Sequence, residues 1–292
     1  MVDFALRQAG RFAFGLLGAL AAAAAISAVP EAHRFGPYLA TWGLKLLSFL
    51  EFDFGKSAIT GLVAGQEIAT HLPATLALVT TGGAVALIVG VPLGLMLTTP
   101  ALRRPASPLL LLLAALPVFC AGLALAYGAA KWLAWPVSVN APMTQPAPIF
   151  SADPKALQLA LPAVFTVGLA GAAAVQLALR RATAASAEQR FRSGLKRLGL
   201  SQLEIERVYV APQVTAGLLA SAGEIVRALL AAAVVAEWVF HRPGAADLFV
   251  KSVALQDWNM AALILFVFAA FSFLADLLGR LGAYALVGEA VP

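Results

Sequence analysis

The chain has 292 residues, of which 61% are hydrophobic and only 12% are charged, and its mean hydropathy is +0.86. Soluble globular chains carry about 25% charged residues, so this composition predicts an integral membrane protein with little room for a soluble domain. The formal net charge of +5 is therefore interpreted as basic loops that set membrane topology, not as a nucleic-acid surface. Cys120 is the single cysteine and lies in an apolar run, which excludes a disulfide within the chain.

The first apolar run extends from Phe12 to Val29 and follows Arg7 and Arg11. A basic start and small residues at the end also fit a cleavable signal peptide. The run is nearly as long as the roughly 20 residues of a membrane-spanning helix, so we expect residues 1–30 to hold the first span. Residues 31–71 are more mixed, and we expect them outside the membrane, with an amphipathic surface helix within Phe35–Phe54.

Five more apolar runs predict spanning helices, and they extend over Leu72–Thr98, Ser107–Ala130, Leu157–Leu179, Ala211–Ala236 and Met260–Leu286. With the first run they predict an all-α membrane protein of six transmembrane helices, five of which form a core over residues 72–286. Gly90, Pro92 and Gly94 indicate a kink and a close helix contact near the end of the second run. A short helix is expected over Ala245–Ala254, after the Pro243-Gly244 turn.

Basic residues and tryptophans predict the orientation. With the N-terminus inside, the inside segments hold twelve Lys and Arg residues and the outside segments hold seven. An excess of positive charge marks the cytoplasmic side of multi-pass proteins. The five tryptophans, which favour membrane–water interfaces, all fall in or beside outside segments: Trp42, Trp132, Trp135, Trp238 and Trp258. We therefore expect both termini and the charged segment 182–210 on the inside.

The charged segment 182–210 has the pattern of two helices separated by a break. Phe191, Leu195 and Leu198 fall on one helical face, and Gly199 reads as the end of that helix. Ser201 and the glutamate three residues later form a capping-box pattern that starts the next helix. A capped amphipathic turn of this kind is typical of a docking element for a soluble partner. The alternative is a basic loop that only fixes orientation.

This segment resembles the cytoplasmic loop of bacterial ABC importer permeases, whose motif places a glycine ahead of an apolar residue and a proline. Gly199, Tyr209 and Pro212 match that motif, whereas Ser193-Gly194-Leu195 departs from its E-A-A start. In such permeases this loop contacts the ATPase. The resemblance assigns the contact here to Phe191, Arg192, Leu195, Lys196, Arg197, Leu198, Gly199, Leu200 and Ser201.

Further blocks resemble the B-type permease of dipeptide, oligopeptide and nickel importers. That branch ends its fifth helix in E-x-V-F-x-x-P-G, which is matched by Glu237, Val239, Phe240, Pro243 and Gly244. Other matching blocks are Asp53-Phe54-Gly55, His71-Leu72-Pro73-Ala74-Thr75, Gly90-x-Pro92-Leu93-Gly94-Leu95, Asp257-Trp258 and Asp276. The branch usually has an Arg-x-x-Pro-Gly-Asp-Pro stretch after its first helix, and Ala28-Val29-Pro30-Glu31 stands there instead.

The resemblance implies a type I ABC importer permease in a bacterial inner membrane. It would work by alternating access with a second homologous permease, two ATPase subunits and a periplasmic or lipid-anchored binding protein. The solute would be small and polar, such as a peptide or a metal chelate. No Walker A motif is found in the sequence, so ATP and Mg would be bound by the partners, and no cofactor, metal or nucleic acid is expected on this chain. The alternative is an ATP-independent secondary transporter or a channel-like membrane protein.

Glu224 and Arg227 are unusual because they lie within the predicted span Ala211–Ala236. Charges at membrane depth are costly and normally face a polar cavity or a partner. Their i, i+3 spacing allows them to pair with each other. They are therefore candidates for a translocation path that contacts a polar or zwitterionic solute, and the alternative is an ion pair that ties this helix to a neighbouring helix or to the second permease.

Overall fold

The computed structural model describes residues 2–31, 35–98, 117–135, 154–185, 195 and 197–288. Within these ranges the chain is helical, apart from turns and an isolated β-bridge between Lys56 and Val63. The elements in chain order are α1 (Val2–Ser27), η1 (Val29–Glu31), α2 (Phe35–Leu50), α3 (Ala64–Thr98), α5 (Val118–Leu133), α6 (Pro154–Ala185), α8 (Gln202–Glu204), η2 (Ile205–Val210), α9 (Ala211–Ala220), α10 (Ala222–Val239), α11 (Ala245–Ala254) and α12 (Trp258–Val287).

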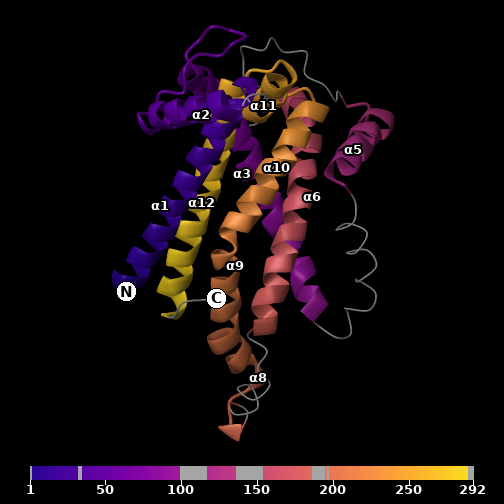
Figure 1. Cartoon of the computed structure of the whole chain (residues 1–292). Helices are drawn as coiled ribbons and strands as arrows, with labels where there is room; N and C mark the ends of the chain where they lie inside the picture. Colours follow the sequence, from indigo (N-terminus) through magenta and orange to yellow (C-terminus); the bar gives the residue numbers. More distant parts are fainter. Residues whose placement is uncertain are drawn as a thin grey trace.

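The long helices run side by side, and the two ends of the bundle they form have different structures (Figure 1). At one end α2 and α11 lie across the helix ends, and we refer to this as the α11 end. At the other end α8 and η2 extend past the other labelled helices, and residues 195 and 197–210 are called the tip below. The expected short helix over Ala245–Ala254 is confirmed to the residue.

Four described helices, α1, α3, α6 and α12, are long and apolar enough to cross a membrane. The bent pair α9–α10 would make a fifth span. The expected span over Ser107–Ala130 is described only from Pro117 onward, where α5 is a shorter apolar helix. The expectation of six spans therefore stays a prediction. The helices α1 and α3 begin earlier than their apolar runs, at Val2 and Ala64, because polar first turns can extend an apolar helix beyond the membrane.

The helix expected over Ala211–Ala236 is bent at Ser221, where the axes of the flanking segments differ by 49°. The Ser221 hydroxyl donates a hydrogen bond to the carbonyl oxygen of Gly217, and such back-bonding bends helices. Next to the bend, Gly223 packs so closely on α12 that a Cβ there would lie 3.0 Å from the Ser272 carbonyl oxygen. The bend thus follows from local hydrogen bonding together with a close helix crossing.

Small residues allow α3 and α6 to pack closely. A Cβ on Gly82 would lie 2.6 Å from Val167, and one on Gly168 would lie 2.6 Å from Val85. Further along, a Cβ on Gly90 would lie 2.9 Å from the Ala172 carbonyl oxygen. Glycines at such spacing let transmembrane helices approach backbone to backbone. The close contact predicted from Gly90 is therefore confirmed, and α3 and α6 are the most extensively packed pair of helices in the described chain.

The surface helix α2 is fastened to the end of α1. The Trp42 indole N–H donates to the carbonyl oxygen of Ala21 at 3.0 Å, and the Tyr38 hydroxyl donates to that of Ala25 at 3.3 Å. Phe49 is buried beneath the helix, whereas Leu44 and Leu47 are exposed on its other side. A helix is therefore confirmed within Phe35–Phe54, but these residues are apolar on both sides, so its amphipathic character and its place at the membrane surface stay predictions.

Candidate functional site

The tip has a defined local structure that follows from two sequence signals. Gly199 adopts a φ of +83°, the left-handed conformation that a glycine enters without steric penalty. Next, the Ser201 hydroxyl accepts from the Glu204 N–H, and the Glu204 carboxylate accepts from the Ser201 N–H at 2.8 Å. These reciprocal bonds are a complete capping box. The glycine break and the capping box predicted from sequence are both confirmed.

The tip also has a small core and an exposed apolar surface. Leu195 and Ile205 are buried, while Leu198 is 79% exposed and Leu203 is 60% exposed. Sequence periodicity placed Leu195 and Leu198 on one face, and this was wrong for Leu198 because it lies in the turn at Gly199, past the helix end. Of the other expected contact residues in the described part, Arg197 ends the helix before the turn, Gly199 lies in the turn, and Leu200 and Ser201 come after it. Phe191, Arg192 and Lys196 lie outside the described residues.

Helix length places the tip beyond the membrane core. Trp238 is 59% exposed near the α11 end, and an exposed tryptophan favours the interface. About 20 helical residues cross the core, so a span that begins at Trp238 reaches the opposite boundary near Leu219. The preceding chain, back to Gln202, is longer than the membrane needs. Exposed leucines at the tip therefore form an apolar surface in water, which is typical of a protein-binding site.

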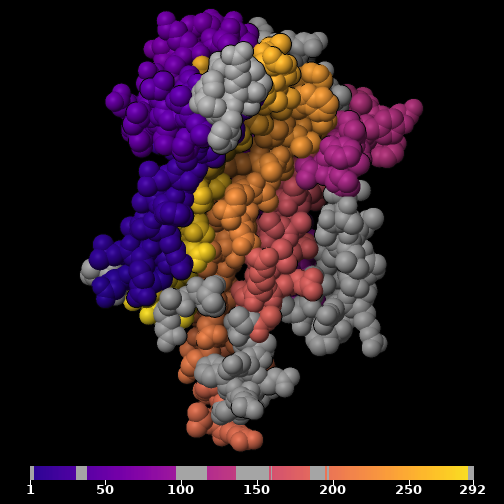
Figure 2. Space-filling view, in the orientation of Figure 1, coloured from indigo at the N-terminus to yellow at the C-terminus, as the bar shows by residue number. Residues whose placement is uncertain are grey.

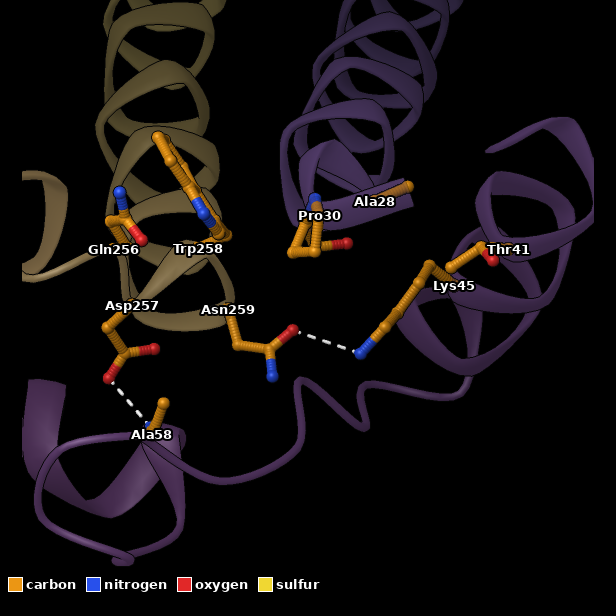
Figure 3. Close-up of a pocket in the computed structure, with 10 residues that line it drawn as sticks. Ala28, Pro30, Thr41, Lys45, Ala58, Gln256, Asp257, Trp258 and Asn259 are labelled. Carbon is orange, nitrogen blue, oxygen red and sulfur yellow. Dashed lines mark hydrogen bonds between the residues drawn. The ribbon is translucent and has the colours of Figure 1, made fainter. Parts of the chain in front are cut away.

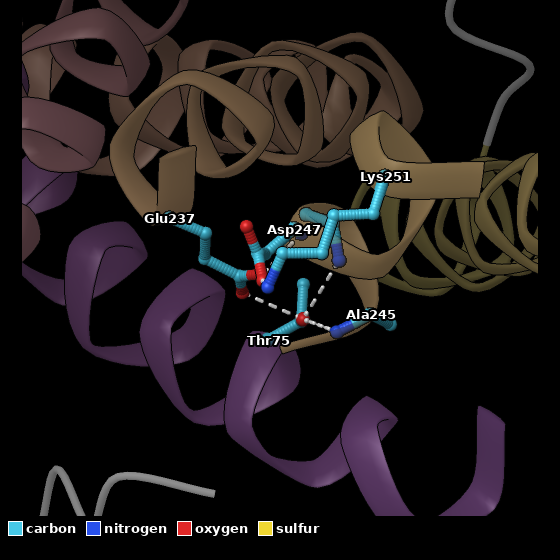
Figure 4. Close-up of polar contacts among 6 residues, drawn as sticks. Thr75, Glu237, Ala245, Asp247 and Lys251 are labelled. Carbon is cyan, nitrogen blue, oxygen red and sulfur yellow. Dashed lines mark hydrogen bonds and ion pairs between the residues drawn. The ribbon is translucent and has the colours of Figure 1, made fainter. Parts of the chain in front are cut away.

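A buried polar cluster joins α3, α10 and the start of α11 at the α11 end (Figure 4). The Thr75 hydroxyl donates to Glu237 Oε1 at 2.6 Å and accepts from the Ala245 N–H at 2.8 Å. The second carboxylate oxygen of Glu237 accepts from the Asp247 N–H at 2.8 Å. Thr75 is fully buried and Glu237 is 1% exposed. We call Thr75, Glu237 and the first-turn amides of α11 the latch. In it, the two side chains accept the hydrogen bonds that the amides at the start of α11 donate.

Two neighbours complete the latch. Gly244 precedes α11, and a Cβ at this position would overlap the Glu237 carboxylate. Arg242 is 4% exposed, and burial lowers the pKa of its guanidinium, while the charge of Glu237 acts in the opposite direction. On the first turn of α11, Asp247 forms an ion pair with Lys251. The E-x-V-F-x-x-P-G block thus has a physical meaning here, since its glutamate holds α11 and its glycine leaves room for the carboxylate.

A second buried carboxylate organises the loop between α2 and α3. Asp257 precedes α12, accepts from the Met260 N–H, and is fully buried. It also accepts from the Ser57 hydroxyl at 2.6 Å and from the Ala58 N–H at 2.8 Å. Beside it, a hollow opens at the α11 end between α1, α2 and α12 (Figure 3). There Lys45 donates to the side-chain oxygen of Asn259 at 2.9 Å.

The charged pair expected within α10 has a different arrangement from the one its spacing suggested. Glu224 pairs with Arg181 on α6 at 2.7 Å, not with Arg227. Both side chains of that pair are more than half exposed. Arg227 is exposed too, and among the described residues it has no hydrogen bond or ion pair. The ion pair to a neighbouring helix therefore exists for Glu224, while Arg227 is left as a separate cation.

Sequence reasoning named Thr75 and Glu237 only as motif matches and did not connect them. It also missed Arg181 as the partner of Glu224. The available signal for the latch was a threonine at the start of one span and a glutamate at the end of another, both in segments expected on the same side. That signal places the residues at one end of the bundle but does not identify which helices touch.

These features define a class of protein, namely multi-pass helical membrane proteins with a protruding capped tip at one end and a short helix folded back across the other. A family model for the inner membrane component of binding-protein-dependent transport systems matches residues 84–283. The chain belongs to this family, and its fold is that of a type I ABC importer permease.

Solved structures share this fold at low sequence identity. One is a crystal structure of an amino acid ABC transporter with histidines, which is 16% identical with a TM-score of 0.55, over 82% of this chain and 98% of that chain. Another is the MetNI methionine ABC transporter in inward-facing conformations, which is 15% identical with a TM-score of 0.54, over 75% of this chain and 96% of that chain. No curated relative matches the chain.

Proposed function

We propose that the chain is the permease subunit of an ATP-driven importer in a bacterial inner membrane, and that it moves a small polar solute by alternating access. The observation that carries this proposal is the tip, where a capped turn exposes Leu198 and Leu203 beyond the membrane core. A transporter that works alone has no use for an apolar surface in water. A permease driven by a soluble ATPase needs such a surface.

The partners follow from the two ends of the molecule. The tip lies on the cytoplasmic side and fits into a cleft of an ATPase subunit, which binds ATP and Mg and hydrolyses ATP. The α11 end, with α2 and the loop held by Asp257, faces a periplasmic or lipid-anchored binding protein that delivers the solute. A second homologous permease and a second ATPase complete the assembly. Both chain termini are cytoplasmic, in agreement with the distribution of basic residues.

The solute is a small polar molecule with peptide-like character. Support for a peptide or a peptide-like chelate comes from the E-x-V-F-x-x-P-G block and the Asp257-Trp258 pair. The structurally similar transporters carry amino acids according to their descriptions. Amino acids and short peptides share an ammonium group, a carboxylate and peptide-like polarity, so one type of path suits both.

Co-purification tests the proposal. The subunit is expressed with its neighbouring genes and purified as wild type, as Leu198→Asp and as Leu62→Asp. Leu62 is a matched control because it is 55% exposed in the loop at the α11 end. We expect ATPase subunits with the wild type and with Leu62→Asp, and their loss with Leu198→Asp. An ATPase that is absent from the wild-type assembly would favour the secondary-transporter alternative.

A further inference from the structure

One face of α10 is uncovered by the rest of the described chain. The exposed residues of this helix are Glu224, Arg227, Ala231 and Trp238. They follow one another at i, i+3, i+7 and i+14, which places them in a single stripe along the helix. Figure 2 shows α10 open to view between α12 and α6. The small side chain of Ala231 leaves the middle of this stripe unobstructed.

Arg227 lies at the depth of the membrane centre. Trp238 marks the interface near the α11 end, and Arg227 is eleven residues further along the helix, which corresponds to about 16 Å of rise. The hydrocarbon core is about 30 Å thick. An arginine at this depth does not face lipid tails at a tolerable cost unless it reaches water or a partner. The stripe on α10 is therefore not a lipid-facing surface.

The other spans support this contrast. Exposed residues in the middle of α1 and α3 are apolar, such as Phe14, which is 82% exposed, and Ile88, which is 72% exposed. These faces suit lipid. On α10, by contrast, the stripe presents Glu224 and Arg227, and the carboxylate of Glu224 already binds Arg181. Since the carboxylate of Glu224 is neutralised by Arg181, the stripe presents one uncompensated positive charge, that of Arg227.

We infer that this stripe lines a water-filled solute path and that Arg227 selects solutes that carry a negatively charged group, such as a carboxylate. This inference rests on the proposed transport function and assigns the solute class. A zwitterionic contact made by Glu224 and Arg227 together is not what the geometry provides. Small anions are attracted to this level of the path, and small cations are repelled from it.

Thiol labelling with charged reagents tests the inference in the assembled complex. Cys120 is the single cysteine, so Cys120→Ala provides a background for one added cysteine. Ala231→Cys places a thiol one turn from Arg227, at about 5–6 Å between Cβ atoms. The probes are the anionic sulfonatoethyl and the cationic trimethylammonioethyl methanethiosulfonates. The control is Ile88→Cys on the apolar face of α3, and labelling of this subunit is followed by mass spectrometry.

We expect the Ala231→Cys thiol to react while the Ile88→Cys thiol does not. At the Ala231→Cys thiol, the ratio of the anionic to the cationic labelling rate should exceed the ratio for a free thiol by about three- to tenfold. This is the effect of a unit charge at this distance in a hydrated and screened site. Arg227→Met removes the preference. Arg227→Lys keeps it, and therefore shows that any loss in the methionine variant is due to charge.

Two results would overturn the inference. The first is an Ala231→Cys thiol that is as unreactive as the Ile88→Cys thiol, which means that lipid or a second permease subunit covers the stripe. The second is a reactive thiol whose preference is the same with and without Arg227. Either result, obtained on a complex that still carries its ATPases, rejects the path assignment and leaves the importer proposal intact. Loss of the ATPases from the wild type rejects the importer proposal instead.

Discussion

Replacing Thr75 by valine should release α11 from the bundle. Valine has nearly the same shape as threonine, so the change removes the hydroxyl and little else. The Ala245 N–H and Glu237 Oε1 then lose their partners in a buried site. Each unsatisfied buried group costs about 1–2 kcal/mol here, at the low end because the carboxylate keeps its bond from the Asp247 N–H. We expect a total of about 2–4 kcal/mol.

Hydrogen exchange of the α11 amides measures this cost directly. Exchange through local opening reports the free energy that holds a segment closed. Since about 1.4 kcal/mol corresponds to a factor of ten, the amides of residues 245–248 should exchange roughly 30- to 700-fold faster in Thr75→Val than in wild type. The control is Thr80→Val, because Thr80 is exposed on the same helix and donates only to the carbonyl oxygen of Ala77. Exchange that rises by less than about threefold in Thr75→Val would refute the latch, since that corresponds to under 1 kcal/mol.

Three further changes have expected outcomes. Gly244→Ala should speed α11 exchange as Thr75→Val does, because the added methyl displaces the Glu237 carboxylate, whereas Gly18→Ala, which has open space around it, should not. Asp257→Asn should make the 56–62 loop more sensitive to protease, because an amide has one acceptor oxygen and cannot replace both Oδ2, which accepts from Ser57 and Ala58, and Oδ1, which accepts from the Met260 N–H, and an unchanged cleavage rate would contradict this. Ser201→Ala should lower the free energy that holds the tip turn closed by about 1 kcal/mol through loss of its cap, measured as faster exchange of the Glu204 amide, which donates to the Ser201 hydroxyl, and unchanged exchange would count against the capping box.

Much of the architecture could be predicted because it depends on local patterns. Apolar runs identify spanning helices, Gly199 marks a left-handed turn, and Ser201 with Glu204 forms a cap between neighbours in sequence. The helix Ala245–Ala254 follows from the turn that precedes it. Each of these features is decided within one or two helical turns, so a single sequence contains the necessary information.

The remaining features depend on contacts between distant segments. The bend at Ser221 arises from a back-bonded hydroxyl combined with the close approach of α12 at Gly223, and the second factor is tertiary. The pairing of Glu224 with Arg181 depends on how α6 and α10 pack. Sequence spacing allowed Arg227 as the partner because it considers one helix alone. For the same reason, the link between Thr75 and Glu237 was visible only in the structure.

The most direct test of the importer account is photo-crosslinking at the tip. A benzophenone side chain replaces Leu198 or, as the matched control, Leu62, in cells that express the neighbouring genes. Because Leu198 is 79% exposed beyond the membrane core, the account predicts an adduct between position 198 and a Walker-motif ATPase subunit, and no such adduct at position 62. An assembled complex without an ATPase adduct at 198, or with equal adducts at both positions, would contradict the tip as the site where the ATPase docks.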